Sequence, residues 1–199
     1  YINAFYAAND TIFIGTKRGL SIKVKEDIVS TATPEIHRIT QINGTTYLLT
    51  GKGLFTLSNL NSDKGIEKTE KVSLEKTLDQ SRINDIIYDG KQYWIASNQG
   101  LYNITNIKNE PAERMVEDNF VALLKFQDRI LAATASEGLY SFIPNQFEDS
   151  FIVLEGFKIN DISIQNEKEV WIATKDQGIY RLDLKTHEPE PIVNYNMGL

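Results

Sequence analysis

Few residues of this chain have a type and spacing suited to catalysis. The two histidines, His37 and His187, lie far apart, and neither has a metal-ligating partner one helical turn away, so the sequence predicts no metal site. The absence of cysteine excludes thiol catalysis, disulfides and Cys-ligated zinc. No phosphate-binding loop and no nucleophile elbow occurs. We therefore predict neither a metal nor a cofactor.

Carboxylate pairs are the remaining candidates for chemistry, and the chemistry would be glycoside hydrolysis. That reaction needs two carboxyl groups facing each other across a sugar, about 5–9.5 Å apart. Glu117-Asp118 and Glu148-Asp149 are adjacent pairs, and neighbouring strand residues point to opposite faces. Asp85 and Asp161 recur within an Asn-Asp dipeptide, which favours a structural role such as a hydrogen bond to a turn of a neighbouring unit. We predict that the chain is not an enzyme.

Composition limits the other function classes. The 199 residues carry 21 Lys and Arg against 27 Asp and Glu, a formal charge of −6, which argues against a nucleic-acid-binding face. A hydrophobic content of 41% predicts a folded core rather than disorder. No apolar run approaches about 18 residues, so no segment is expected to span a membrane as a helix.

Internal repetition is the strongest signal. Five segments share the pattern aromatic, aliphatic, small residue, Thr or Ser, a polar turn, then Gly followed by Leu or Ile. They are 13–20, 47–54, 94–101, 131–139 and 171–179. Their glycines, Gly19, Gly53, Gly100, Gly138 and Gly178, lie 34, 47, 38 and 40 residues apart. An irregular period near 40 residues fits repeated four-stranded units joined by loops of varying length.

Each unit resolves into four expected strands, A to D. An apolar segment about 17 residues before each glycine is strand A, and a tight turn such as Asn43-Gly44 or Asp89-Gly90 joins it to the patterned strand B. Strand C follows the glycine, and a variable outer strand D completes the unit. The expected units cover 1–35, 36–79, 80–117, 118–156 and 157–199.

Repeated four-stranded antiparallel units predict an all-β fold, a β-propeller of five blades. One such sheet cannot bury its two faces, whereas blades placed side by side bury both. The aromatic residue that begins strand B is expected to fill the space between blades; these residues are Phe13, Tyr47, Trp94 and Trp171, with Leu131 as the exception. The small residue two positions later allows close packing, and Leu49 breaks that pattern.

The two best copies, Trp94 to Tyr102 and Trp171 to Tyr180, resemble the two-component regulator propeller repeat. The resemblance implies the extracytoplasmic, periplasmic sensor part of an inner-membrane hybrid histidine kinase, which recognises oligosaccharides released from polysaccharides. It also implies downstream signalling domains, a kinase outside this chain and usually seven blades. Residues 195–199 read as the start of another blade. We therefore interpret 1–199 as part of a larger propeller, with a complete five-bladed ring as the alternative.

Strand direction predicts where a ligand would bind. Because strands alternate in direction, the B–C turns share one face with the connections into strand A, and that face opens on the central channel. Polar residues there suit the hydroxyl, carboxylate or sulfate groups of sugars. The predicted ligand-binding residues are Lys17, Arg18, Arg38, Lys52, Arg82, Asn84, Asn98, Gln99, Asn160 and Asp176, and Asn119 also leads into a strand A. The expected partners are an oligosaccharide and further blades, with a homodimer left open. A protein-interaction scaffold and, less favoured, a glycan-active enzyme are the alternatives.

Overall fold

The structure is a computed structural model that describes residues 1–8, 10–61 and 65–193. It contains five four-stranded antiparallel sheets, each built from four consecutive strands. The predicted all-β fold is therefore confirmed. Asn9 and the end of the last expected blade, residues 194–199, lie outside the described residues.

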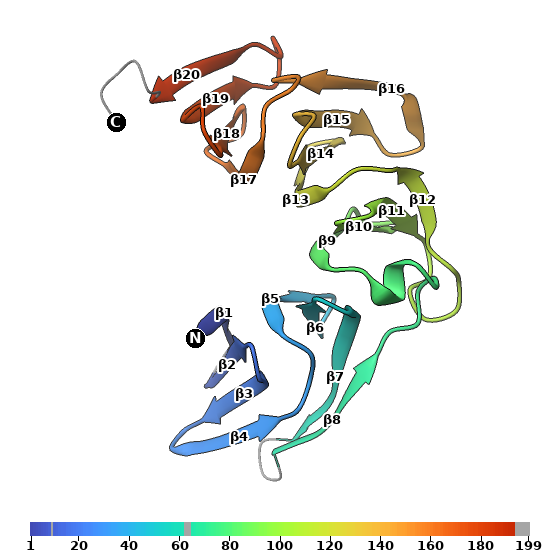
Figure 1. Ribbon diagram of the computed structural model, residues 1–199, viewed down its shortest axis with the longest axis vertical. Helices are drawn as coiled ribbons and strands as arrows, with labels where there is room; N and C mark the ends of the chain where they lie inside the picture. The colour runs from blue at the N-terminus through green and yellow to red at the C-terminus, as the bar shows by residue number, and fades with distance from the viewer. Residues whose placement is uncertain (9, 62–64, 194–199) are drawn as a thin grey trace.

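The five sheets follow one another along the chain (Figure 1). Blade 1 comprises β1 (Ile2–Ala8), β2 (Thr11–Thr16), β3 (Gly19–Val24) and β4 (Asp27–Thr31); blade 2 comprises β5 (Ile36–Ile42), β6 (Thr45–Thr50), β7 (Gly53–Asn61) and β8 (Gly65–Lys71). Blade 3 comprises β9 (Ile83–Tyr88), β10 (Tyr93–Ser97), β11 (Gly100–Ile104) and β12 (Glu113–Val116). Blade 4 comprises β13 (Phe120–Phe126), β14 (Arg129–Thr134), β15 (Leu139–Ile143) and β16 (Gln146–Val153); blade 5 comprises β17 (Ile159–Ile164), β18 (Glu169–Thr174), β19 (Ile179–Asp183) and β20 (Pro189–Val193).

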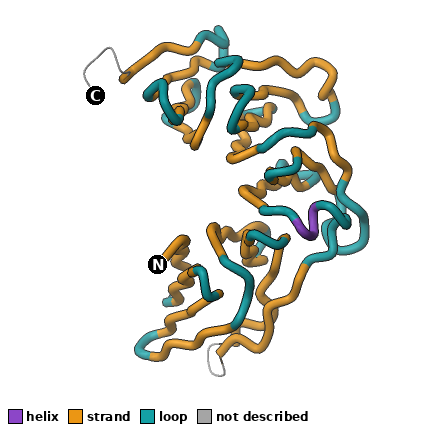
Figure 2. Tube along the Cα trace, in the orientation of Figure 1, coloured by secondary structure: helices purple, strands orange, loops and turns teal. Residues whose placement is uncertain are grey.

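The blades are arranged as an open arc around a common centre. The first strand of each blade, from β1 to β17, lies on the inner side, and the fourth lies on the outer side (Figure 1). Among the described residues the only helix is a short 3-10 turn, η1 (Leu78–Gln80), between blades 2 and 3 (Figure 2). The inner strands are therefore the elements that bring side chains toward the centre.

The hydrophobic core lies between blades rather than within them. Four clusters of buried residues each join two successive blades. In the cluster between blades 3 and 4, Trp94 is 1% exposed and its ring centroid lies 4.9 Å from that of Phe142. Phe13 and Tyr47 are buried in the two preceding interfaces. Each blade is thus stabilised mainly by its neighbours, as expected for a repeat fold.

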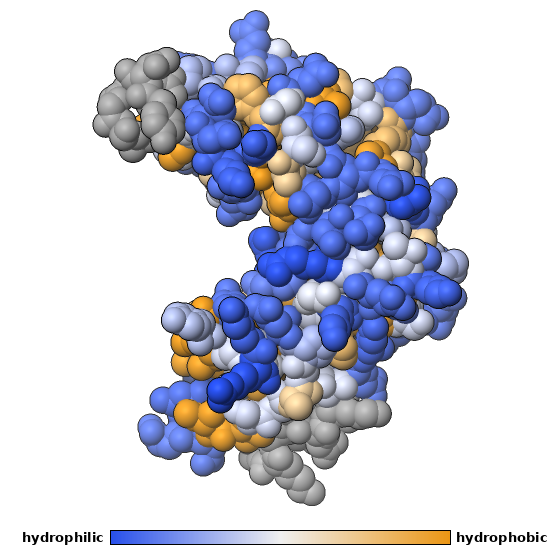
Figure 3. Space-filling view, in the orientation of Figure 1, coloured by the Kyte–Doolittle hydropathy of each residue, from blue (hydrophilic) through white to orange (hydrophobic). Residues whose placement is uncertain are grey.

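Trp171 departs from the expectation that these aromatics fill the space between blades. Trp171 is 38% exposed, because no further blade among the described residues lies against that face of blade 5. The opposite face of blade 1 is also uncovered, with Ile2 67% and Phe5 63% exposed. Figure 3 shows hydrophobic surface along this free side of the first blade and hydrophilic surface on the inner side of the arc. The arc therefore presents two uncovered blade faces.

Leu49, which breaks the small-residue pattern, is accommodated by an insertion. It is fully buried and packs in the cluster that contains Leu74 and Leu78, from the longer connection between blades 2 and 3. This connection also accounts for the spacing of 47 residues between Gly53 and Gly100. The extra residues thus form part of the core around the larger side chain.

The recurring Thr or Ser and Gly form one repeated turn. In blade 3 the Ser97 hydroxyl donates to the Gly100 carbonyl and accepts from the Gln99 N–H, at 3.1 Å each. Thr50 makes the same two contacts with Gly53 and Lys52. Gly100 has φ of 154°, and a Cβ there would collide with the Val116 carbonyl oxygen. Only glycine fits this turn without moving the outer strand.

We expect Gly100→Ala to lower the free energy of unfolding by about 1–3 kcal/mol, because it adds backbone strain and a steric clash. Gly51→Ala is the matched control, since Gly51 lies in the corresponding turn of blade 2 with no atom near its added Cβ. That variant should stay within about 0.5 kcal/mol of the parent. Urea unfolding of the two proteins measures the difference, and equal stabilities would contradict the steric argument.

Candidate functional site

Every inner strand contains a β-bulge near its first residue. The pairing with the second strand shifts at Ile2/Ala4 in blade 1, and the same shift recurs in the other four blades. The residue skipped by the pairing is Asn3, His37, Asn84, Val121 or Asn160. A bulge bends its strand and redirects a side chain, and bulges are common beside functional sites. The inner strands thus place an extra side chain near the centre of the arc.

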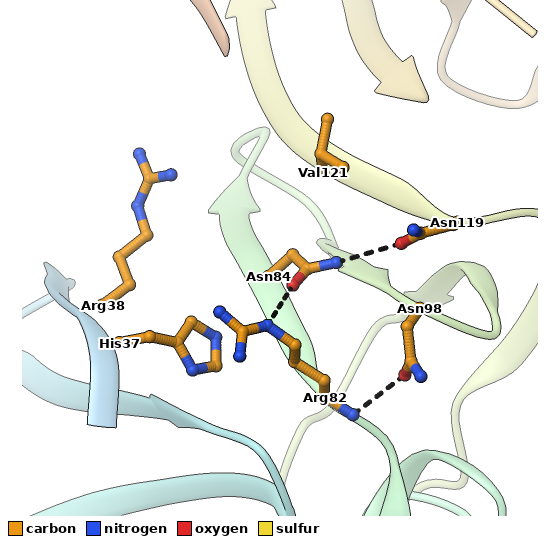
Figure 4. A pocket seen from close by; sticks show the side chains of 7 residues that line it. All are labelled: His37, Arg38, Arg82, Asn84, Asn98, Asn119 and Val121. Carbon is orange, nitrogen blue, oxygen red and sulfur yellow. Dashed lines mark hydrogen bonds between the residues drawn. The ribbon is translucent and has the colours of Figure 1, made fainter. Parts of the chain in front are cut away.

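Three successive bulge residues line one pocket of about 390 Å³ on the inner side of the arc. The pocket is lined by His37 and Arg38 from β5, Arg82 and Asn84 at the start of β9, Asn98 in the β10–β11 turn, and Asn119 and Val121 at the start of β13 (Figure 4). Blades 2, 3 and 4 all contribute. No carboxylate is among the seven lining residues.

A hydrogen-bond chain holds the blade 3 side of this pocket in place. The Arg82 Nε–H donates to Asn84 Oδ1 at 3.1 Å, and Asn84 Nδ2 donates to the Phe120 carbonyl at 2.6 Å. Asn98 Oδ1 accepts from the Arg82 backbone N–H at 2.9 Å, and the Asn98 N–H donates to the Arg82 carbonyl at 3.1 Å. These contacts fix the turn and the strand together before any ligand arrives.

The same backbone contact joins turn and strand in other blades. The residue after the B-strand Thr donates to the residue that precedes strand A: Gly51 to Glu35, Ala135 to Asn119, and Lys175 to Lys158. The B–C turns and the connections into strand A therefore lie next to each other.

The bulge side chains also bind the next blade. Nε2–H of His37 donates to the Ile83 carbonyl at 2.5 Å, and Asn84 makes the equivalent bond to Phe120. Ile83 and Phe120 are the first residues of their inner strands. The polar bulge residues of blades 2 and 3 thus connect one inner strand to the following one.

Asp85, beside the bulge, forms a second connection between blades. Its Oδ1 accepts from the Ile86 N–H, and its Oδ2 accepts from the Leu123 N–H of blade 4, both at 2.9 Å. Arg38 of blade 2 lies 3.3 Å from the same Oδ2. Burial raises the pKa of Asp85, although Arg38 and the two N–H groups oppose that shift. The sequence predicts that Asp85 bonds to a turn of a neighbouring blade. It bonds instead to Leu123, which lies in the inner strand of blade 4.

The surroundings of His37 favour the neutral form of its side chain. Burial lowers the pKa of its imidazole, and the nearby charges of Arg82 and Arg38 lower it too, outweighing the bond to Ile83 and the charge of Glu35. Its Nδ1 is buried and has no hydrogen-bond partner among the described residues. Because Nε2 donates to a carbonyl, Nδ1 carries the lone pair in the neutral ring.

We expect acidification below about pH 6.5 to destabilise the protein partly through His37. A histidine whose pKa is lowered on folding binds fewer protons in the folded state, so stability is lost as pH falls from 6.5 through the lowered pKa. His37→Gln keeps a donor for the Ile83 carbonyl and does not titrate. The difference in unfolding free energy between parent and variant should change by up to about 1.4 kcal/mol per pH unit in this window. Parallel stability profiles would contradict this prediction.

The structure brings four of the ten predicted ligand-binding residues together. Arg38, Arg82, Asn84 and Asn98 line the pocket. Gln99 lines a separate hollow beside Lys76 and Gln80. The other five are exposed and lie outside the pocket: Lys17, Arg18, Lys52, Asn160 and Asp176. Asp176 lies 3.8 Å from Lys158 in an ion pair.

The predicted ligand-binding residues include neither His37 nor Val121. The position of His37 near the start of a strand A allows it to face the central channel, but a partly exposed strand or turn histidine is the favoured interpretation of the sequence alone, and Val121 is apolar. Both occupy the repeat position of Asn84, which was predicted to face the ligand. Aligning the second residue of each strand A identifies this shared position, although Asn3 and Asn160 occupy it as well and lie outside the pocket.

Neither a metal centre nor a membrane-spanning helix is found within the described ranges. No group of three or more His, Asp or Glu side chains there could hold a metal ion. No helix in that part of the chain has the length and hydrophobicity needed to cross a bilayer.

Comparison with solved structures supports the propeller fold. The extracellular domain of BT4673 from B. thetaiotaomicron, described as a one component system, superposes with a TM-score of 0.77 at 14% identity, covering 97% of this chain and 28% of that one. A second BT4673 structure, described as a hybrid two component system, gives 0.71 at 18% identity, covering 90% and 26%. The WD40 propeller domain of Doa1 gives 0.69 at 7% identity, covering 94% and 67%.

These identities establish the fold alone. The chain spans little more than a quarter of the length of the BT4673 domains. No protein-family model matches the sequence, and no curated protein sequence matches it.

Proposed function

We propose that this chain is a non-catalytic sensing propeller from the extracytoplasmic, periplasmic part of a two-component signalling protein, and that it recognises oligosaccharides derived from polysaccharides. The pocket between blades 2, 3 and 4 is the ligand site. The similarity to extracellular domains of signalling systems and the repeat pattern support the sensing role. The proposal that the ligand is an oligosaccharide rests on one observation: amide, guanidinium and imidazole groups from three blades line a single pocket.

The pocket chemistry favours binding over turnover. Asn84, Asn98 and Asn119 offer both donors and acceptors, which is what sugar hydroxyl groups require. Glycoside hydrolysis would need two facing carboxyl groups, and the lining residues include none. Asp85, the nearest buried carboxylate, is occupied by two N–H groups and Arg38.

A glycan panel scored by thermal shift tests the proposal. The panel contains neutral and acidic oligosaccharides, each added at high concentration to the 199-residue chain. A ligand at 100 times its Kd stabilises the folded state by about 2.7 kcal/mol, which corresponds to a Tm increase of about 5–10 °C for a domain of this size. Substitution of Asn84 by Ala should abolish that increase. No shift with any glycan, together with a specific protein partner in pull-downs, would support the interaction scaffold instead.

We further propose that additional blades cover the two open faces of the arc, so that the chain is part of a larger propeller. Asn84-Asp85 binds the next inner strand through Phe120 and Leu123. Asn160-Asp161 is the same dipeptide at the same position of blade 5. Asp161 accepts only from the Ile162 N–H among the described residues. The Asn160 side chain and Asp161 Oδ2 make no hydrogen bond to a described residue, and with exposed Trp171 they match the contacts that a following blade would make.

Fluorescence quenching tests the further blades. With Trp94 replaced by Phe, Trp171 is the only tryptophan of the chain. Acrylamide should quench it readily in residues 1–199 and much less in the product of the complete gene. Equal quenching in both proteins would contradict coverage of this face by a following blade.

Sedimentation velocity with and without a binding glycan shows whether glycan binding is accompanied by formation of a homodimer.

A further inference from the structure

The charge of the pocket is opposite in sign to that of the chain. The protein carries a formal charge of −6, yet the pocket is lined by two arginines and no acidic residue. Arg38 is partly neutralised by Asp85 at 3.3 Å. Arg82 forms no ion pair with any residue that the structure describes. One guanidinium in the pocket therefore remains uncompensated.

The Arg82 side chain is also held in position before a ligand binds. Asn84 fixes its Nε–H, and the guanidinium lies between the His37 ring and Asn84 (Figure 4). Its two terminal nitrogens make no hydrogen bond to a described residue. A guanidinium held at Nε presents these terminal donors as a fork that matches the two oxygens of a carboxylate or sulfate.

The nearby carboxylates do not bind the two terminal nitrogens of Arg82. Asp85 is directed to Leu123, Ile86 and Arg38. Glu35 accepts from the Asn3 side chain at 3.0 Å. Asp118 accepts from Ser136 and from the Asn119 N–H through Oδ1. Among the described residues, therefore, no carboxylate pairs with the Arg82 guanidinium, and its terminal nitrogens remain free to bind an anionic ligand.

We propose that the ligand is an acidic saccharide whose anionic group, a carboxylate or a sulfate ester, binds Arg82, with Arg38 as the second cation. Hydroxyl groups of the same sugar bind the asparagine side chains around it. This inference rests on the proposed function and narrows its ligand class from oligosaccharides to anionic ones.

Isothermal titration of the 199-residue chain with three matched trimers tests the inference. The probes are trigalacturonic acid, neutral galactotriose and a galactotriose bearing sulfate esters, so that the two acidic arms separate carboxylate from sulfate. We expect at least one acidic trimer to bind about tenfold to a hundredfold more tightly than the neutral one, with an affinity that falls as salt is raised. Arg82→Gln should remove this preference, and Arg82→Lys should retain only part of it, since it keeps the charge but not the fork.

Lys91→Gln is the matched control. It removes one positive charge from the exposed β9–β10 turn of the same blade, outside the pocket, and should leave all affinities unchanged. Preferential binding of neutral glycans, here or in the wider panel, would overturn the acidic assignment while leaving the sensing role intact. An acidic preference that survives Arg82→Gln would overturn it as well. Failure of every glycan in the panel would overturn both proposals.

Discussion

Trp94→Ala should lower the free energy of unfolding by about 3–5 kcal/mol. Trp94 is 1% exposed and packs across the interface between blades 3 and 4 against Phe142. Its Nε1–H also donates to Asp89 Oδ2 at 2.8 Å. Truncation removes a large apolar surface from a core shared by two blades, leaves a cavity and removes the donor to Asp89 Oδ2, whereas Oδ1 still accepts from the Lys91 and Gln92 N–H groups. Equilibrium urea unfolding followed by circular dichroism measures the loss.

Trp171→Ala is the matched control, because Trp171 occupies the same repeat position. Its side chain is 38% exposed and has no blade on its outer side in the described chain. We expect a loss of about 1 kcal/mol or less. Similar losses for the two variants would show that the repeat position itself, and not burial between blades, determines the stability.

Asp85→Ala should cost about 2–4 kcal/mol, because it leaves the buried N–H groups of Ile86 and Leu123 without an acceptor. It also removes the partner of Arg38. One side chain here connects blades 2, 3 and 4, so its loss should affect both interfaces. Thermal unfolding and hydrogen exchange of the Leu123 amide measure the global and the local effect.

Asp161→Ala removes the same side chain from the equivalent position of blade 5. Asp161 is exposed and accepts only from Ile162 among the described residues, so the loss should stay below about 1 kcal/mol. Equal destabilisation by the two substitutions would contradict a role for Asp85 between blades.

The contacts that join successive inner strands also shape the pocket. Asp85 and Asn84 hold successive inner strands together, and the same bulges turn His37, Asn84 and Val121 toward the centre. The contacts that stabilise the blade interfaces therefore also position the ligand-binding side chains. A ligand bridging blades 2 and 3 would act directly on an interface between them.

Much of the fold follows from the sequence alone. The repeat of an aromatic residue, a small residue, Thr and Gly predicts four-stranded blades, since each of these residue types is needed by the local geometry of a strand or a turn. Gly100, for example, adopts a φ that glycine alone tolerates easily, and Ser97 closes the turn before it. The net charge and the lack of cysteine limit the function classes in the same direct way.

The pocket depended on tertiary structure. Arg38, Arg82 and Asn98 line the pocket, whereas Lys17 and Asp176, which the sequence predicts for the same face, lie outside it. Only the placement of blades 2, 3 and 4 brings residues 37 and 121 together, more than 80 positions apart in the chain.

The sequence by itself determined the blade, because turn geometry and strand alternation are properties of neighbouring residues. Tertiary structure alone decided which side chains are buried and which meet at the centre. Trp94 and Trp171 have the same local pattern, yet one is buried and the other exposed, because burial depends on whether another blade lies against that face. The location of the charged pocket depends on the same stacking, since its residues come from three separate sheets.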